Sequence, residues 1–143
     1  MRGDLRKLIS RFTAVDERLA AIRIKATYFY IRLICAHAST ENKDDTTKDA
    51  FYDKLEILYN RCRRSDIKML VGDFNAKVGS EGIFGPTVGK QSLHEKTSDN
   101  GFRLVSFAAA QNSTRLQHLN IHKATWRFPD LNAKNQIDHV VID

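Results

Sequence analysis

The chain has 143 residues, which is the size of one domain and enough to enclose a hydrophobic core. Apolar residues make up 42% of it and charged residues 28%, a globular composition that excludes a disordered or fibrous chain. The net charge of +6 favours a polyanionic partner such as nucleic acid, although a basic solvated surface explains the same charge.

Neither a membrane span of about 20 apolar residues nor an apolar signal core is evident in the sequence. We therefore expect a soluble intracellular protein, in the nucleus or cytoplasm, with no membrane partner; no protein partner can be deduced. Cys35 and Cys62 are expected to be buried free thiols.

Two kinds of element are predicted at the start of the chain. Residues 1–17 form a basic segment whose apolar side chains have the spacing of a short amphipathic helix. Residues 18–25 and 27–36 are rich in β-branched and aromatic side chains, and the short gap between them predicts an antiparallel hairpin.

A helix is predicted next, because Thr46 and Asp49 have the spacing of a capping box and an apolar stripe follows. It should end near Arg63. Arg64 belongs to a basic cluster at this helix end, which could meet a phosphate backbone or could be a solvated face that favours the helix C-terminus.

The apolar run that starts at Ile67 and breaks at Gly72 predicts a buried central strand. Residues 79–97 read as a long loop and residues 102–111 as a mostly buried helix, and strands are predicted at 124–128 and 137–142. Interleaved helices and strands together with a hairpin indicate an α/β layered sheet with antiparallel or mixed pairing.

Asp73 and Asn75 follow the central strand and are the strongest chemical signal. If the backbone stays extended, the two side chains point the same way and place a carboxylate beside an amide. This pair suits phosphodiester hydrolysis, since the carboxylate can accept a proton from water and the amide can donate to an oxyanion. The alternative is an Asx-type turn in which both side chains serve the backbone.

Two other residues are candidates that depend on their surroundings. His37 ends a predicted strand and gains a functional interpretation only if it lies close to Asp73. Asp138 shares one face of the last strand with Val140 and Ile142, so its carboxylate needs a partner, catalytic or structural.

Four stretches carry a family resemblance, in the order Ile34–Glu41, Val71–Gly79, Ile121–Arg127 and Asn135–Val140. Together they resemble the endonuclease/exonuclease/phosphatase superfamily, and within it the endonuclease domain of LINE-type (non-LTR) retrotransposons and craniofacial development protein 2-like sequences. The resemblance covers residues 18–143 as a partial domain and leaves residues 1–17 outside it.

The resemblance implies a partial four-layer α/β sandwich of mostly antiparallel sheets with outer helices. It also implies hydrolysis of a phosphodiester in DNA that depends on a divalent metal, Mg²⁺ or Mn²⁺.

The roles of the candidate residues follow from the same resemblance. Asp73 matches the carboxylate that orients or deprotonates the attacking water and is the metal ligand, and Asn75 and His37 match residues that contact the scissile phosphate. Asp138 matches the carboxylate that holds a catalytic histidine, and Trp126 matches a tryptophan that packs near the site and is a candidate substrate contact. Arg64, from the basic cluster and not from the resemblance, is a further candidate substrate contact.

Some elements of the family pattern have no counterpart in this sequence. No metal-binding glutamate precedes the predicted hairpin, and the chain ends before the terminal Ser-Asp-His motif. His139 is not the catalytic histidine, because it directly follows Asp138 and points to the opposite face. The resemblance thus implies a domain truncated at both ends, with a weakly held metal and impaired activity.

Three functions remain open on these grounds. The first is a metal-dependent DNA endonuclease descended from a retrotransposon endonuclease–reverse transcriptase. The second is an inactive remnant that binds nucleic acid, and the third is a phosphatase-type member that acts on a small phosphoester. The basic charge favours the nuclease over the phosphatase.

Overall fold

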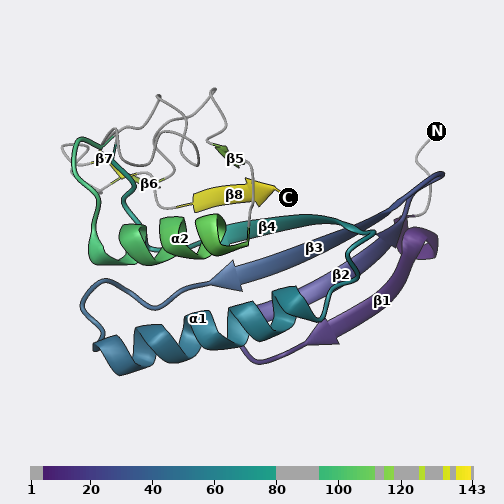
Figure 1. Cartoon of the computed structure of the whole chain (residues 1–143), viewed down its shortest axis with the longest axis horizontal. Coiled ribbons are helices and arrows are strands. Elements are labelled where there is room, and N and C mark those ends of the chain that lie inside the picture. Colours follow the sequence, from purple (N-terminus) through teal and green to yellow (C-terminus); the bar gives the residue numbers. More distant parts are fainter. Residues whose placement is uncertain are drawn as a thin grey trace.

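The main feature of the structure, a computed structural model, is a six-stranded sheet in the order β1-β2-β3-β4-β8-β5, with two helices packed against it (Figure 1). The structure describes residues 5–79, 94–111, 115–117, 126–127, 134–135 and 138–142.

The bounds of the elements are as follows. The main sheet consists of β1 (Ile9–Ala14), β2 (Leu19–Lys25), β3 (Tyr30–His37), β4 (Ile67–Asp73), β8 (Asp138–Ile142) and β5 (Arg115–Gln117). The remaining elements are the 3-10 turn η1 (Leu5–Leu8), the helices α1 (Asp45–Asn60) and α2 (Asp99–Ala110), and a separate pair of strands, β6 (Trp126–Arg127) and β7 (Lys134–Asn135).

The pairing of the strands is mixed. β1, β2 and β3 form an antiparallel meander, β3 and β4 run parallel with α1 as the crossover between them, and β8 is antiparallel to both β4 and β5. The α/β class, the mixed pairing and the β2–β3 hairpin are therefore confirmed. Of the four expected layers, the described residues supply one sheet, one helical layer and the short β6–β7 pair.

Both helices pack on one face of the sheet, where a single hydrophobic cluster joins them to the strands. Alternation along the strands turns Ile34 and Leu70 into this cluster, and both are fully buried. Leu33 and Met69 alternate with them, point to the opposite face and stay half-buried. The strands that carry the site are therefore held on one face by the hydrophobic core that they share with the two helices.

The predicted helix in residues 1–17 is wrong. Only the short turn η1 is helical there, and residues 9–14 form β1 instead. The physical reason is pairing: β1 satisfies the backbone donors and acceptors along the free edge of β2, which a helix in that place would leave exposed.

The helix starts also differ from expectation. The N-cap of α1 is Asp44, two residues before the predicted Thr46, and its side chain accepts a hydrogen bond from the Thr47 backbone N–H at 2.7 Å. The helix ends at Asn60 rather than Arg63. α2 begins before residue 102, where Ser98 Oγ caps the Gly101 N–H at 3.2 Å.

Several other expectations have mixed outcomes. Both cysteines are free, but Cys35 is exposed rather than buried, because it lies on the strand face that carries no helix in the described part of the chain. Most of the predicted loop at 79–97 lies outside the described residues, as does most of the strand at 124–128. Neither described helix is long and apolar enough to cross a lipid bilayer.

Candidate functional site

Three of the predicted site residues lie in one row across neighbouring strands. β3 and β4 are parallel, so their carboxyl ends meet at the same edge, where His37 is the register partner of Asp73. On the other side of β4, Asp73 is the register partner of Asp138 in β8. The structure thus brings His37, Asp73 and Asp138 together although the sequence separates them widely.

This row is accessible from the face of the sheet opposite the helices. His37 is exposed and Asp73 half-buried, whereas Ala36 and Leu70, on the other face of the same strands, are buried. Register partners on adjacent strands project from the same face of a sheet. A ligand that approaches this face can therefore meet both side chains.

Gly72 makes the close approach of β3 and β4 possible directly before the row. Its φ is +147°, and a Cβ at this position would lie 1.8 Å from the carbonyl oxygen of Ala36, its register partner. Since any side chain would collide with backbone, the glycine is needed to keep His37 beside Asp73.

The expected geometry of Asp73 and Asn75 is wrong. Asn75 has a left-handed backbone with φ of +46°, so the chain is no longer extended there and the two side chains do not project in parallel. Asp73 Oδ1 accepts a hydrogen bond from the Asn75 backbone N–H at 2.8 Å, which is an Asx turn. Asn75 Nδ2 donates to the Ala38 carbonyl at 3.0 Å.

These hydrogen bonds use only one polar atom of the Asp73 carboxylate and one hydrogen of the Asn75 amide. Asp73 Oδ2 accepts no hydrogen bond from the part of the chain that the structure describes, and an amide nitrogen carries a second hydrogen. Both interpretations of this pair therefore coexist: one atom of each side chain shapes the loop, and another stays available for chemistry.

Asn100, at the start of α2, connects the two loops that carry the site. Its side chain is 1% exposed, and Nδ2 donates to the carbonyls of Ser39 (2.9 Å) and Asn75 (3.2 Å). Ala38 N–H in turn donates to the Asp73 carbonyl at 2.8 Å. Sequence reasoning missed Asn100, because this residue precedes the helix predicted at residues 102–111.

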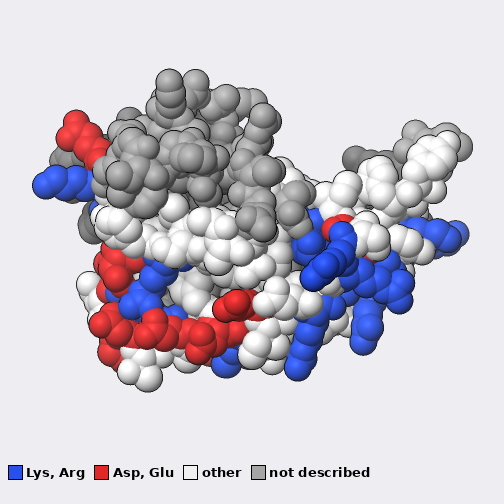
Figure 2. All heavy atoms as spheres, in the orientation of Figure 1, with Lys and Arg blue, Asp and Glu red and all other residues white. Residues whose placement is uncertain are grey.

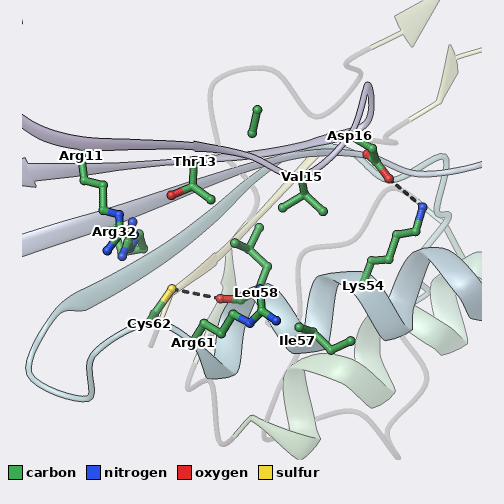
Figure 3. A pocket seen from close by; sticks show the side chains of 11 residues that line it. Arg11, Thr13, Val15, Asp16, Arg32, Lys54, Ile57, Leu58, Arg61 and Cys62 are labelled. Carbon is green, nitrogen blue, oxygen red and sulfur yellow. Dashed lines mark hydrogen bonds and ion pairs between the residues drawn. The ribbon is translucent and has the colours of Figure 1, made fainter.

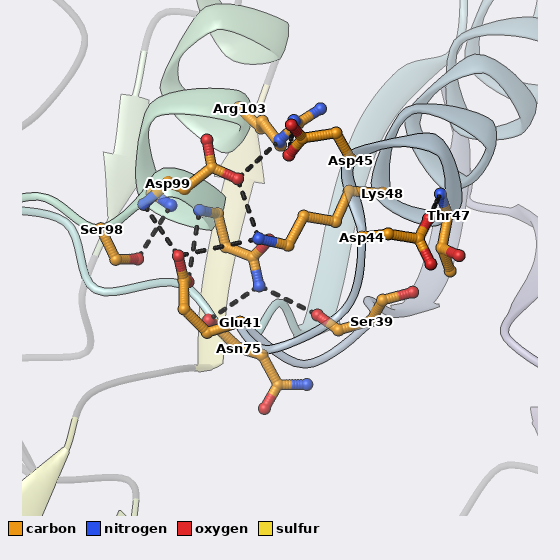
Figure 4. Close-up of polar contacts among 12 residues, drawn as sticks. Ser39, Glu41, Asp44, Asp45, Thr47, Lys48, Asn75, Ser98, Asp99 and Arg103 are labelled. Atoms are coloured by element: carbon orange, nitrogen blue, oxygen red, sulfur yellow. Dashed lines mark hydrogen bonds and ion pairs between the residues drawn. The ribbon is translucent and has the colours of Figure 1, made fainter.

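Glu41 binds the N-terminus of α2, as Figure 4 shows. Its carboxylate accepts hydrogen bonds from the backbone N–H groups of Asp99 (3.0 Å) and Asn100 (3.3 Å), which are unpaired at a helix start. Lys48, 5% exposed, forms an ion pair with Asp99 at 2.9 Å. The ammonium of Lys48 and the guanidinium of Arg103 lower the pKa of the Asp99 carboxyl.

His139 is buried on the helix side of β8, whereas strand alternation predicted only that it points away from the face of Asp138. Its Nε2 lies 2.7 Å from the Ala76 carbonyl oxygen, and because a carbonyl only accepts, Nε2 carries the hydrogen. The hydrogen bond of His139 thus holds the loop after β4 from the helix-covered face of the sheet, which is the face away from His37 and Asp73.

Arg64 does not lie at the row, and the predicted packing of Trp126 near the site stays a prediction. Arg64 lies in the turn between α1 and β4, at the opposite end of β4 from Asp73, a separation of about 20 Å along the strand. Arg64 is therefore too far from Asp73 to contact the same phosphate, and its predicted contact with another part of the substrate stays a prediction. Trp126 lies in β6, which pairs with β7 outside the main sheet.

The described side chains do not by themselves fit a metal site. No group of three or more His, Cys, Asp or Glu side chains converges within the described part of the chain. A hard cation such as Mg²⁺ prefers near-octahedral oxygen ligands, and at the row the described side chains offer the single carboxylate of Asp73.

Comparisons with known sequences show partial relatives. No family model matches the chain. Craniofacial development protein 2 from Bos taurus is 28% identical over 130 residues, which cover 88% of this chain and 22% of that protein, and the match from Tragulus javanicus has the same values. The chain thus spans about a fifth of the length of the curated relatives it matches.

Comparisons with solved structures agree on the fold. The endonuclease domain of TRAS1, a telomere-specific non-LTR retrotransposon, superposes with a TM-score of 0.56 at 12% identity, over 87% of this chain and 49% of that one. An endonuclease/exonuclease/phosphatase family protein from Leptotrichia buccalis gives 0.52 at 18% identity, over 87% and 40%. The chain therefore shares its fold with the TRAS1 endonuclease domain and with the endonuclease/exonuclease/phosphatase family protein from Leptotrichia buccalis, and it is similar in sequence to craniofacial development protein 2.

Proposed function

We propose that this chain provides the central part of a phosphodiesterase site that acts on DNA as an endonuclease. The observation that carries the proposal is the row of His37, Asp73 and Asp138 at the meeting point of β3, β4 and β8. The shared fold, the similarity to a retrotransposon endonuclease domain and the net charge of +6 support it.

Each residue of the site has a role that its surroundings allow. Asp73 Oδ2 orients the attacking water and accepts its proton, while the Asx turn holds the carboxylate in place through Oδ1. His37 donates to a phosphate oxygen, as does the second amide hydrogen of Asn75. A positioned base of this kind contributes roughly 10²–10⁴-fold to a rate.

A divalent metal, Mg²⁺ or Mn²⁺, is part of the proposal only as a requirement to be tested. It would neutralise charge on the phosphate and lower the pKa of a water. Because the described donors do not complete a metal site, we assign no step to it.

The decisive experiment is a nicking assay on supercoiled plasmid with Mg²⁺. We expect slow nicking that EDTA abolishes and that Asp73→Ala lowers by at least about 100-fold. Asp53→Ala is the matched control, since Asp53 is an exposed carboxylate on α1, outside the row. Nicking that survives in Asp73→Ala would refute the assignment of the base.

A second candidate is a nucleic-acid-binding protein without catalysis. The Asx turn of Asp73 and Asn75 and the incomplete set of metal donors favour it. Plasmid binding that weakens steeply with salt, without nicking by any variant, would support this alternative. Hydrolysis of a small phosphoester without cleavage of DNA would instead indicate a phosphatase.

A further inference from the structure

A row of basic residues crosses four strands on the helix-covered face, away from the site. Arg11 in β1 is the register partner of Arg23 in β2, Arg23 of Arg32 in β3, and Arg32 of Lys68 in β4. Like charges directly opposite each other in a sheet are destabilising. The row therefore needs negative charge nearby.

The buried carboxylate of Asp66 forms its ion pair with one member of this row, Arg23. Asp66, whose side chain is fully buried, accepts from Arg23 Nε at 2.7 Å and from Arg23 Nη2 at 2.8 Å. Lys68 lies over the Tyr59 ring at 5.2 Å. Asp66 thus satisfies Arg23 in a bidentate pair. Neither Arg11 nor Arg32 forms an ion pair with a carboxylate of the described residues, although the charge of Arg32 helps to lower the pKa of the Asp66 carboxyl.

Arg32 is the unusual member. It is 8% exposed, and its buried Nε donates no hydrogen bond to any described residue. A buried cationic donor without an acceptor is costly, and native proteins keep such groups rarely. Its presence in the middle of a sheet that is otherwise well packed points to a partner from outside.

Arg32 reaches into a cavity of about 490 Å³ between β1 and α1, shown in Figure 3. Arg11 and Arg61 also line it, from the edge strand and from the end of α1. This volume lies within the range of small-molecule sites. Three guanidinium groups from three elements therefore face one space.

The rest of the lining does not neutralise these charges. Asp16, at the far end, is paired with Lys54 at 2.8 Å. Cys62 donates from Sγ to the Leu58 carbonyl at 3.3 Å, and burial raises the pKa of its thiol, so it stays neutral. Val15 and Ile57 add apolar surface to the same cavity.

We propose that this cavity binds a phosphate monoester, with the phosphate among Arg11, Arg32 and Arg61 and the organic group against Val15 and Ile57. Arginine forks match phosphate oxygens two at a time, and three of them favour a group with a charge near −2 over a singly charged carboxylate. The site is separate from the Asp73 row, because Arg32 and His37 are about 17 Å apart along β3 and lie on opposite faces of the sheet.

Calorimetric titration with phenyl phosphate, in EDTA to prevent turnover, tests the proposal. We expect binding that Arg11→Gln and Arg61→Gln each weaken at least about tenfold, because each loses a charged hydrogen-bond donor. Both residues are exposed, so these variants should fold. Lys25→Gln, which removes an exposed charge outside the cavity lining, is the matched control and should change binding by less than about twofold.

Arg32→Met provides a second, independent readout. Without ligand it should raise the melting temperature, because a buried cation whose Nε has no acceptor among the described residues is replaced by an apolar side chain of similar length, and it should abolish binding. Unchanged binding in Arg32→Met, or equal loss in the Lys25→Gln control, would overturn the proposal.

Two further arms identify the source of the phosphate and separate this site from the proposed nuclease site. If a 5′-phosphorylated oligonucleotide binds but its 5′-hydroxyl form and phenyl phosphate do not, the phosphate that the cavity recognises belongs to the end of a nucleic-acid strand. If phenyl phosphate binds, the ligand is a small molecule. No binding of either phosphomonoester refutes the site. Binding should be unchanged in Asp73→Ala; a loss there would place the phosphate at the Asp73 row instead.

Discussion

The two polar regions of the sheet differ in how their side chains find partners. At the carboxyl ends of β3 and β4, Glu41, Asn75 and Asn100 bond to the backbone of neighbouring segments, and each bond connects one loop of the site to another. On the helix-covered face, Arg11 and Arg32 have no described carboxylate of their own. The surface charge also differs between these regions: Figure 2 shows acidic side chains over α1 and α2 and basic ones towards β1.

This difference indicates that the two regions are stabilised in different ways. The first region is held in place by neutral and ionic hydrogen bonds within the chain, which is how a site is kept in one geometry before its substrate arrives. The second holds an excess of positive charge, which an external anion would complete. Mutations should therefore affect the two regions differently: geometry in the first, stability and anion binding in the second.

The largest effect is expected at Gly72. Gly72→Val should lower the free energy of unfolding by about 4 kcal/mol or more, because its Cβ would collide with the Ala36 carbonyl and its φ suits only glycine. Urea unfolding measures the change. Ala14→Val, on the exposed edge strand β1, is the control and should cost little; equal loss in both variants would contradict the role of the close approach.

The second largest effect is expected for Asp66→Ala. It should lower the free energy of unfolding by about 2–3 kcal/mol at pH 7, because it removes the acceptor of a buried bidentate pair. The Arg23 guanidinium lowers the pKa of the Asp66 carboxyl. The pair therefore stabilises the fold above the unfolded pKa near 4, and this contribution is lost as the pH falls through the lowered folded value.

The pH dependence of unfolding checks the assignment of Asp66. The acid limb of stability should flatten in Asp66→Asn and stay unchanged in Asp53→Asn, whose carboxylate is exposed. A steep acid limb that persists in Asp66→Asn would assign the dependence to other carboxylates.

Asn100→Ala should destabilise by about 2 kcal/mol, since it leaves the carbonyls of Ser39 and Asn75 without a donor. Hydrogen exchange should increase at residues 38–41 and 74–78, the loops that Asn100 connects, rather than along β2. Asn60→Ala, an exposed amide at the end of α1, is the control. Exchange that rises uniformly would argue against a local connection.

The smallest effect is expected at Glu41. Glu41→Ala removes an acceptor from the first N–H groups of α2 and should lower the free energy of unfolding by about 1 kcal/mol. Thermal unfolding of this variant beside Glu56→Ala, an exposed carboxylate on α1, measures the difference. Equal melting temperatures would show that water replaces the Glu41 carboxylate without loss.

Local patterns predicted much of the fold. The hairpin of β2 and β3, the central strand β4 and the strand β8 have strong β-branched or apolar signals and are present where expected. The helix expected in residues 1–17 is absent, because pairing with the edge of β2 outweighs a weak helical spacing. The helix starts differ from the predicted ones where a capping side chain sets them, at Asp44 for α1 and at Ser98 for α2.

The candidate site could be predicted only in part. The identities of His37, Asp73 and Asp138 came from motifs, and their register places them in one row. Asn75 was expected to extend beside Asp73, but a left-handed backbone turns it toward Ala38. The Asx turn itself is local and was the alternative that the sequence offered, whereas the hydrogen bond to the Ala38 carbonyl depends on a distant segment and could not be predicted.

By itself, the sequence determined the strands β2, β3, β4 and β8, the two helices and the motif residues at the ends of β3 and β4, because these depend on periodicity and on neighbours close in the chain. Only the tertiary structure decided that Arg64 lies at the wrong end of β4, that Asn100 joins two loops, and that basic residues far apart in sequence face one cavity. The reason is physical: strand register and helix packing bring together groups that are distant in sequence, and their partners, or lack of partners, exist only once the sheet is formed.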